Sequence, residues 1–292
     1  DAPMVGRDAD LARVVAGFER AVRDGAGHRL TVLGDAGIGK SRLGREVAAA
    51  LGSRARILTG RCPAYGDGVT FWPLREVVLE EAGGARVDSL AELLSGEADG
   101  ERIAAQIGAA IGLTQEPTRP DELFPAIRRF FEAVADRQPL VVVLEDVHWA
   151  EATFLDLIEY LADAARESLF LLCLARPELL EARPAWGAAS RNVDTVLLEP
   201  LDASEIRLIA ERLAGGALVP DMRARVVETA QGNPLFAEQL VAALQDEHAV
   251  PLPASLQALL AARLDRLGPA ERDLLRCAAV IGTSFTVDAL TV

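Results

Sequence analysis

The stretch "RLTVLGDAGIGKSRLGREVAAAL", residues 29 to 51, decides the fold of this chain. It opens with a short β-branched run, passes through a glycine-rich turn, and continues with apolar residues at helical spacing. Inside it, Gly34-x-x-x-x-Gly39-Lys40-Ser41 matches the Walker A pattern of a phosphate-binding loop. The pattern lies between a predicted strand and a predicted helix, which is the context that such a loop requires.

Each part of the pattern has a mechanical reason. Glycines let the backbone curl so that successive N–H groups point at phosphate oxygens, and the next helix adds its positive N-terminal end. Lys40 would reach the β and γ phosphates, and the Ser41 hydroxyl would be a Mg²⁺ ligand. We therefore predict that ATP or ADP, with Mg²⁺, is bound by Gly34, Asp35, Ala36, Gly37, Ile38, Gly39, Lys40, Ser41 and Arg42.

Lys40 is the only lysine among 30 basic residues. Lysine is a compact point charge whereas arginine is a planar fork, so a phosphate cradle is a place where the two are not equivalent. GTPases of the Ras type read guanine with N/T-K-x-D, and this chain has no second lysine to supply that motif. A GTPase of the Ras type is therefore excluded.

A second motif, "VVVLEDVHWAE" at 141 to 151, places two acids after an apolar strand, about a hundred residues beyond the loop. This is the Walker B arrangement, at the sheet edge where open α/β folds bind ligands. One acid would hold Mg²⁺, which needs only one or two carboxylates, and the other would orient or deprotonate the attacking water. We interpret His148 as packing and hydrogen bonding at the strand end, because metal-dependent phosphoryl transfer needs no histidine.

Continuous apolar runs recur along the first two thirds of the chain, at 29–34, 55–60, 140–144, 169–175 and 195–200. Strands that are apolar on both faces are typical of a parallel sheet covered by helices on each side. We predict an α/β P-loop NTPase domain at 1–200, with a parallel five-stranded sheet and a helical insert at about 73–137. Within that insert, helices are expected over 73–82, 88–112 and 121–137. No run is long enough to span a bilayer, so no membrane is expected.

After residue 200 the pattern becomes helical. Asp202-x-x-Glu205 predicts a capping box at the start of a helical lid over 201–250, and two amphipathic helices follow in 251–292. Thr153, with Asp156, is predicted to cap the helix after the acidic pair in the same way.

Net charge and cysteine spacing exclude some classes of binding partner and cofactor. The net charge of -14 and the lack of a basic run argue against nucleic acid binding by this stretch. Cys62, Cys173 and Cys277 are too scattered for a zinc site or a disulfide framework, so we expect reduced thiols and a cytoplasmic location. Because the chain starts with Asp1, we expect it to be a fragment of a longer polypeptide.

Six segments together carry a resemblance to a known family: "VGRDADL", "GDAGIGKSRL", "GRCPAYGDGVTFWPL", "LEDVHWAEATFLDLIEYLA", "LLCLARPEL" and "QGNPLFAEQLV". They resemble the ATPase region, of the AAA_16 type, of the STAND class of AAA-like regulators. The likeness is greatest to large bacterial LuxR-type transcriptional regulators and to proteins joined to adenylyl cyclase domains. It covers nearly the whole chain, with the motifs in the family's order.

The resemblance implies roles for further residues. Val5, Gly6 and Arg7 would line the adenine, and Arg176 would be the sensor arginine that approaches the γ-phosphate. Pro234, in the Gly-x-Pro element, would pack on the base and tie the lid to the nucleotide state.

For the acidic pair, family position implies that Glu145 serves the metal, with Ser41, and that Asp146 serves the water. Glutamate is one methylene longer than the usual aspartate, and neighbours on an extended strand point to opposite faces, so the reverse assignment stays open. The final helices at 251–292 resemble the beginning of a winged-helix domain.

The first functional hypothesis is an ATP-binding signalling switch with slow Mg²⁺-dependent ATP hydrolysis, in which Lys40, Glu145, Asp146 and Arg176 form the catalytic set. Its expected partners are ATP and the sensor and output domains of the same longer chain, with nucleotide-dependent self-association left open. The alternatives are a small-molecule P-loop kinase or AAA+ motor, and a nucleotide-binding scaffold that does not hydrolyse ATP.

Overall fold

The computed structural model describes residues 4–63, 70–84, 86–97, 99–114, 119–187, 192–216 and 218–245, with short pieces at 274–275 and 278–279. Apart from those pieces, the expected beginning of a winged-helix domain at 251–292 lies outside the described residues, as does Cys277.

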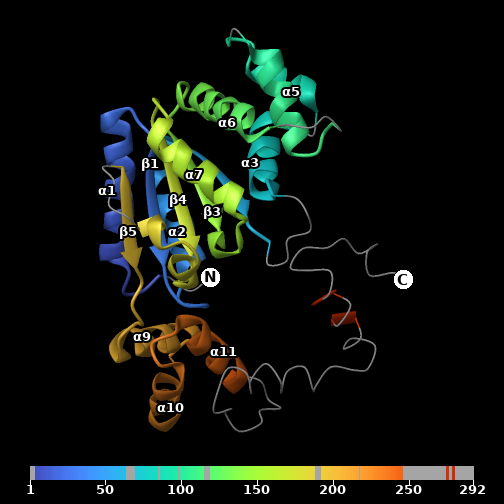
Figure 1. Ribbon diagram of the computed structural model, residues 1–292. Coiled ribbons are helices and arrows are strands. Elements are labelled where there is room, and N and C mark those ends of the chain that lie inside the picture. Colours follow the sequence, from blue (N-terminus) through green and yellow to red (C-terminus); the bar gives the residue numbers. More distant parts are fainter. Residues whose placement is uncertain are drawn as a thin grey trace. The chain divides into compact units, whose positions relative to one another are not determined.

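A parallel sheet organises the chain, and its strands have the order β2-β3-β4-β1-β5 (Figure 1). The strands are β1 (His28–Leu33), β2 (Arg56–Arg61), β3 (Leu140–Glu145), β4 (Leu169–Ala175) and β5 (Val193–Leu197). Every pairing is parallel, which confirms the predicted α/β class with a five-stranded sheet. β5 begins and ends earlier than the predicted 195–200, because its ladder with β1 runs from Val193 to Leu197 and Pro200 has no N–H to extend it.

Helices cover both faces of the sheet. Phe18 of α1 (Asp8–Asp24) meets Phe170 of β4 edge to face, with ring centroids 6.3 Å apart. Leu171 points to the opposite face, where Leu157 and Leu161 of α7 (Ala152–Ala164) pack against it. The strands are therefore buried on both sides, which explains their continuous apolar sequences.

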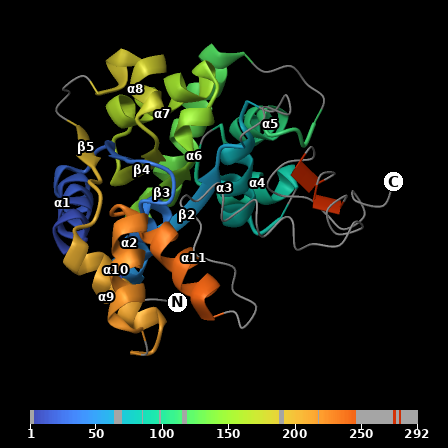
Figure 2. The ribbon, with the colours of Figure 1, turned by 90° about the horizontal axis from the view of Figure 1, so that it is seen from below.

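The described part of the insert between β2 and β3 contains four helices: α3 (Trp72–Ala82), α4 (Val87–Leu93), α5 (Gly100–Ala110) and α6 (Pro120–Ala135). Helices α3 to α5 lie beyond the β2 edge of the sheet (Figure 2). The single helix predicted over 88–112 is wrong. The chain turns after Leu94, and Gly100 starts α5 so close to the Leu94 carbonyl that a Cβ there would lie 2.2 Å from the oxygen.

Shorter elements connect β3 to β5: α8 (Glu178–Ala182) and the 3₁₀ turns η2 (Val147–Trp149) and η3 (Pro184–Gly187). A further 3₁₀ turn, η1 (Gly52–Arg54), follows α2 (Lys40–Leu51). Among the described residues, no helix combines the length and the apolar character that crossing a membrane requires.

Between the sheet and residue 245, the described chain forms three helices: α9 (Ala203–Leu213), α10 (Pro220–Ala230) and α11 (Pro234–Gln245). The predicted capping box is confirmed, since the Asp202 side chain accepts from the N–H groups of Ser204 and Glu205, and Glu205 accepts from the Asp202 N–H. These helices share a core of their own, in which Ile206, Val226 and Val241 are buried.

The described residues divide into two compact units. The first, which we name the sheet unit, is drawn from Ala9–Gly34 and Lys40–Leu197. The second, which we name the lid unit, is drawn from the described residues within Asp1–Asp8, Asp35–Gly39 and Leu198–Val292. The apex of the glycine-rich loop, Asp35–Gly39, therefore packs with the lid helices, while Lys40 packs with the sheet.

Candidate functional site

The strand order brings the predicted motifs of the sheet unit to one edge. Leu33 of β1 is in register with Ala175 of β4, and Arg61 of β2 is in register with Glu145 of β3. Because β4 lies between β1 and β3, the loop after β1 and the acids after β3 are two strand spacings apart, about 10 Å. Arg176, the first residue after β4, leaves the sheet between them.

Lys40 begins α2 and is nearly buried, with 9% of its surface exposed. Its Nζ donates to the Gly34 carbonyl at 2.8 Å, so the ammonium is folded back over the start of the loop. The Gly34 N–H donates to the Ala175 carbonyl at 3.2 Å, which fixes the loop to the end of β4. Ser41 is exposed, and Arg42 pairs with Glu46 one turn along the helix, at 2.9 Å.

The loop apex is a tight turn. The Ile38 N–H donates to the Asp35 carbonyl at 3.3 Å, with Gly37 at φ 78° in the third position of the turn and Gly39 following at φ 108°. Positive φ is readily available only to glycine, and a glycine at this position is what a type II turn requires. The predicted glycines therefore serve the backbone geometry of the loop.

The N-terminal residues that the family resemblance assigned to adenine lie in the lid unit. Val5 packs against the lid core, and Gly6 lies so close to the Glu205 carboxylate that a Cβ would be 2.0 Å from it. Arg7, 7% exposed, donates from Nη2 to the carbonyls of Glu199 at 2.8 Å and Ile38 at 3.3 Å.

The last residue of β3, Glu145, and the next residue, Asp146, share one cation. Glu145 Oε2 accepts from Arg61 Nε at 3.1 Å and from Nη2 at 2.5 Å, and Asp146 Oδ2 is 3.7 Å from Arg61 Nε. The hydrogen bond to Glu145 raises the pKa of Arg61. Arg61 therefore stands where a metal ion would have to compete for the same carboxylates.

The backbone of Asp146 is not extended, so its side chain need not point to the face opposite that of Glu145. It has φ 56° and ψ 37°, the left-handed conformation, which is uncommon outside glycine. The alternation expected of strand neighbours stops at Glu145, and both carboxylates reach the same guanidinium. Strain of this kind clusters at functional sites.

Sequence reasoning missed the role of Arg61. Its only signal was a basic residue at the end of a predicted strand, in "GRCPAYGD". The contact between Arg61 and the acids can be inferred only when β2 is known to lie beside β3.

His148 sits among the charged groups of this edge. Burial lowers its pKa, and the nearby positive charges of Arg176 and Lys40 act in the same direction. The neutral ring accepts the Arg176 N–H at Nδ1, at 3.4 Å, and the Arg176 guanidinium lies 5.6 Å from the centroid of the Trp149 ring. His148 thus hydrogen-bonds at the strand end, as interpreted from the sequence, and brings Lys40, Asp146 and Arg176 into one neighbourhood.

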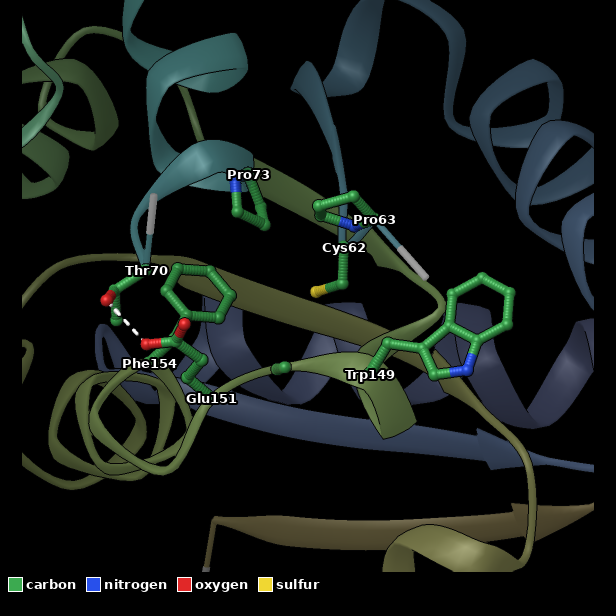
Figure 3. A pocket seen from close by; sticks show the side chains of 8 residues that line it. Cys62, Pro63, Thr70, Pro73, Trp149, Glu151 and Phe154 are labelled. Atoms are coloured by element: carbon green, nitrogen blue, oxygen red, sulfur yellow. Dashed lines mark hydrogen bonds between the residues drawn. The ribbon is translucent and has the colours of Figure 1, made fainter. Parts of the chain in front are cut away.

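A small pocket adjoins the acidic edge (Figure 3). On one side the Thr70 hydroxyl donates to Glu151 Oε2 at 2.5 Å, and Trp149 stands on the other side. Burial raises the pKa of the Cys62 thiol that faces it, so this sulfur is a poor nucleophile. The lining residues are Cys62, Pro63, Thr70, Pro73, Trp149, Ala150, Glu151 and Phe154.

The predicted cap at Thr153 is wrong. Helix α7 begins at Ala152, and its extended N-cap residue is Glu151. Thr153 lies inside the first turn, and Asp156 pairs with Arg183 instead. The Glu151 carboxylate is held by Thr70 and makes no cap hydrogen bond.

The donor set suits Mg²⁺. Among the described residues, no group of three or more histidine, cysteine, aspartate and glutamate side chains could hold a metal alone. Magnesium does not need one, because it is commonly held by one or two protein oxygens, substrate phosphates and waters. A hydroxyl at Ser41 and carboxylates at Glu145 and Asp146 are oxygen ligands of that kind.

A five-stranded parallel sheet with a glycine-rich loop after β1 and an acidic pair at the end of β3 has the fold of the P-loop NTPases. Residues 3–174 match the AAA ATPase domain family AAA_16, and the chain belongs to this family. It is 30% identical, over 322 aligned residues, to an uncharacterized protein of Rhizobium meliloti (strain 1021). That alignment covers 99% of this chain but 30% of the relative, so the chain spans about a third of its relative's length.

Solved structures share the fold. A Signal Transduction ATPase with Numerous Domains (STAND) protein with a tetratricopeptide repeat sensor, from Pyrococcus horikoshii, has TM-score 0.57 at 18% identity, over 99% of this chain and 37% of that one. Cdc6p from Pyrobaculum aerophilum has TM-score 0.50 at 15% identity, over 82% and 60%. The Aeropyrum pernix Orc1 protein, solved in complex with DNA, has TM-score 0.50 at 16% identity, over 100% and 77%.

Proposed function

We propose that this chain is an ATP-binding, slowly hydrolysing switch module of a larger signalling protein. One observation carries the proposal: at one edge of the sheet unit, the Gly34 N–H fixes the start of the phosphate-binding loop to the Ala175 carbonyl at the end of β4, beside the two acids at the end of β3. The similarity to a STAND protein, whose name describes signal transduction, supports the same reading.

In the proposed complex, Lys40 leaves the Gly34 carbonyl and binds the β and γ phosphates. Ser41 and one of the two acids would hold Mg²⁺, which would neutralise charge on the phosphates. The other acid orients the attacking water, and Arg176, between loop and acids, approaches the γ-phosphate. Val5, Gly6, Arg7 and Pro234 line the adenine.

The resting state of the acids supports slow hydrolysis. Arg61 donates twice to Glu145 and lies 3.7 Å from Asp146, so a metal ion must compete with this guanidinium for the carboxylates. This contact also gives weight to a second candidate, a nucleotide-binding scaffold that does not hydrolyse ATP. A multiple-turnover assay of phosphate release separates the two.

The proposed switch places further partners outside this chain. We propose sensor and output domains in the same longer polypeptide, either a LuxR-type DNA-binding domain or a cyclase, in the cytoplasm, with nucleotide-dependent self-association open. The net charge of -14 argues that nucleic acid contacts belong to those other domains.

The test of binding uses Lys40. Lys40→Ala should abolish ATP binding. The wild-type protein should gain about 2.7 kcal/mol of stability when the ATP concentration is a hundred times the dissociation constant. Lys40→Arg keeps the charge but not the compact shape, and is expected to bind weakly. An ATP-dependent melting shift of wild-type size in Lys40→Ala would refute the site.

The test of switching is small-angle scattering without nucleotide, with ADP, and with a non-hydrolysable ATP analogue. Moving a two-state equilibrium from 1:99 to 99:1 needs about 5.5 kcal/mol of differential affinity. Identical scattering in the three states would leave an ATPase without a switch.

A further inference from the structure

Three successive carbonyls at the apex of the phosphate-binding loop are held from within the lid unit. The Ala36 carbonyl accepts from Asn233 Nδ2 at 2.9 Å, and the Gly37 carbonyl accepts from the Leu235 N–H at 3.4 Å. The Ile38 carbonyl accepts from Arg7 Nη2 at 3.3 Å. We call these three donors the carbonyl clamp.

The clamp determines where the loop's N–H groups point. In a planar trans peptide the C=O and the N–H point in opposite directions. No cis peptide occurs in the described backbone. Fixing the Ala36 oxygen on Asn233 therefore directs the Gly37 N–H away from α11. A flip of this central peptide would reverse the N–H and convert the type II turn toward type I.

Asn233 performs two tasks with one side chain. Its Oδ1 accepts from the N–H groups of Leu235 at 3.1 Å and Phe236 at 3.4 Å, which caps the first turn of α11. Its Nδ2 holds the loop. The helix start and the loop apex are thus joined through one rigid amide plane.

Position 37 requires glycine for a second reason, which is how closely the loop apex approaches the start of α11. A Cβ on Gly37 would lie 2.9 Å from Asn233 Oδ1 and 2.9 Å from Leu235 Cβ. The loop apex and the start of α11 therefore fit together only with glycine there, independently of the positive φ.

We propose that Asn233 is a positioning residue for phosphate binding: it sets the orientation of the Ala36–Gly37 peptide and passes the state of the loop to α11. This rests on the proposed function of the loop as a nucleotide site. The proposed coupling runs through the amide side chain of Asn233, which precedes Pro234. This side chain would act on phosphate binding rather than on the base.

Two variants separate the tasks of Asn233. Serine is a good N-cap and carries no charge, so Asn233→Ser keeps the cap, but its hydroxyl is too short to span the amide and reach Ala36. Asn233→Ala loses both the cap and the link to the loop. If Asn233 were only a cap, the serine variant would behave like the wild type in every assay.

The experiment measures three quantities for each protein: the ATP dissociation constant by calorimetry with Mg²⁺, the thermal midpoint without nucleotide, and amide hydrogen exchange of the loop without nucleotide. Asn233→Ser should keep the wild-type midpoint, weaken ATP about two- to tenfold, as expected for one net hydrogen bond, and speed exchange of the Ile38 amide. Asn233→Ala should show the same ATP loss with a lower midpoint.

Wild-type ATP affinity and wild-type loop exchange in Asn233→Ser would overturn the proposal. So would a loss of affinity seen in Asn233→Ala alone, because it would follow the cap. If the wild-type protein bound no ATP, the proposed function would fail, yet the exchange comparison would still show whether Asn233 orders the loop.

Discussion

Replacing Arg61 by glutamine should strengthen Mg²⁺ binding at the nucleotide site. Arg61 holds Glu145 at 2.5 and 3.1 Å and lies 3.7 Å from Asp146, so a metal ion must displace it before using either acid. Glutamine keeps a polar side chain of similar length and removes the charge. The expected change is therefore a gain in metal affinity without a loss of fold.

The magnitude follows from exposure. The Arg61 side chain is 47% exposed, so its ion pair belongs to the solvent-screened class, worth about 0.2–1 kcal/mol. Contact with two carboxylates argues for the upper end. About 1 kcal/mol corresponds to roughly fivefold in an equilibrium constant. We expect the Mg²⁺ concentration for half-maximal ATP turnover to fall about fivefold in Arg61→Gln.

The assay is a Mg²⁺ titration of phosphate release at saturating ATP, with Arg56→Gln as the matched control. Arg56 lies at the other end of β2, is 39% exposed, and pairs with Glu81 at 2.7 Å. Its loss should leave the titration unchanged. If Arg61→Gln needed a higher Mg²⁺ concentration than the wild type for half-maximal turnover, the reasoning would be refuted, since Arg61 would then be assisting the metal or the phosphates.

Three more predictions concern other groups. Glu145→Gln should weaken Mg²⁺-dependent ATP binding while Asp146→Asn should lower turnover, and a loss of turnover alone in both variants would contradict this division. Burial lowers the pKa of His28 in the folded protein, so its contribution to stability is full above the unfolded value of 6.5 and is lost as pH falls through the lowered folded pKa. His28→Gln should therefore flatten the acid side of a stability–pH profile relative to wild type, and parallel profiles would be the contrary result. Burial also raises the pKa of Cys173 to about 12, so site-resolved mass spectrometry should find it unalkylated by iodoacetamide at pH 8 in the native protein and alkylated in urea; labelling in the native state would contradict its burial.

The parts of the fold that were predictable are those with local causes. The strand, loop and helix over 29–51 follow from periodicity and glycine placement, β4 from its apolar run, and the capping box at Asp202 from residue types three apart. The break in the helix expected over 88–112 was harder to predict, because it depends on how closely Gly100 approaches Leu94 in space.

The candidate site was predictable as a set of motifs but not as a set of contacts. The Arg61–Glu145 pair depends on the order of strands, which sequence spacing does not specify. The link from Asn233 to Ala36 joins residues 197 positions apart. The left-handed Asp146 departs from the extended backbone that the strand pattern predicts, and such departures are expected at functional sites.

The resting partners of the site's cations suggest an order of events. The Lys40 ammonium donates to the Gly34 carbonyl, and an anionic phosphate oxygen attracts an ammonium more strongly than a neutral carbonyl does, so nucleotide should draw the ammonium away from that carbonyl. Arg61 is held by two carboxylates, and only a competing cation can replace it there. ATP should therefore bind through the loop before the acids are released, and Mg²⁺ should control turnover more strongly than it controls binding. In that order of events hydrolysis would lag behind nucleotide binding, as the proposed switch requires.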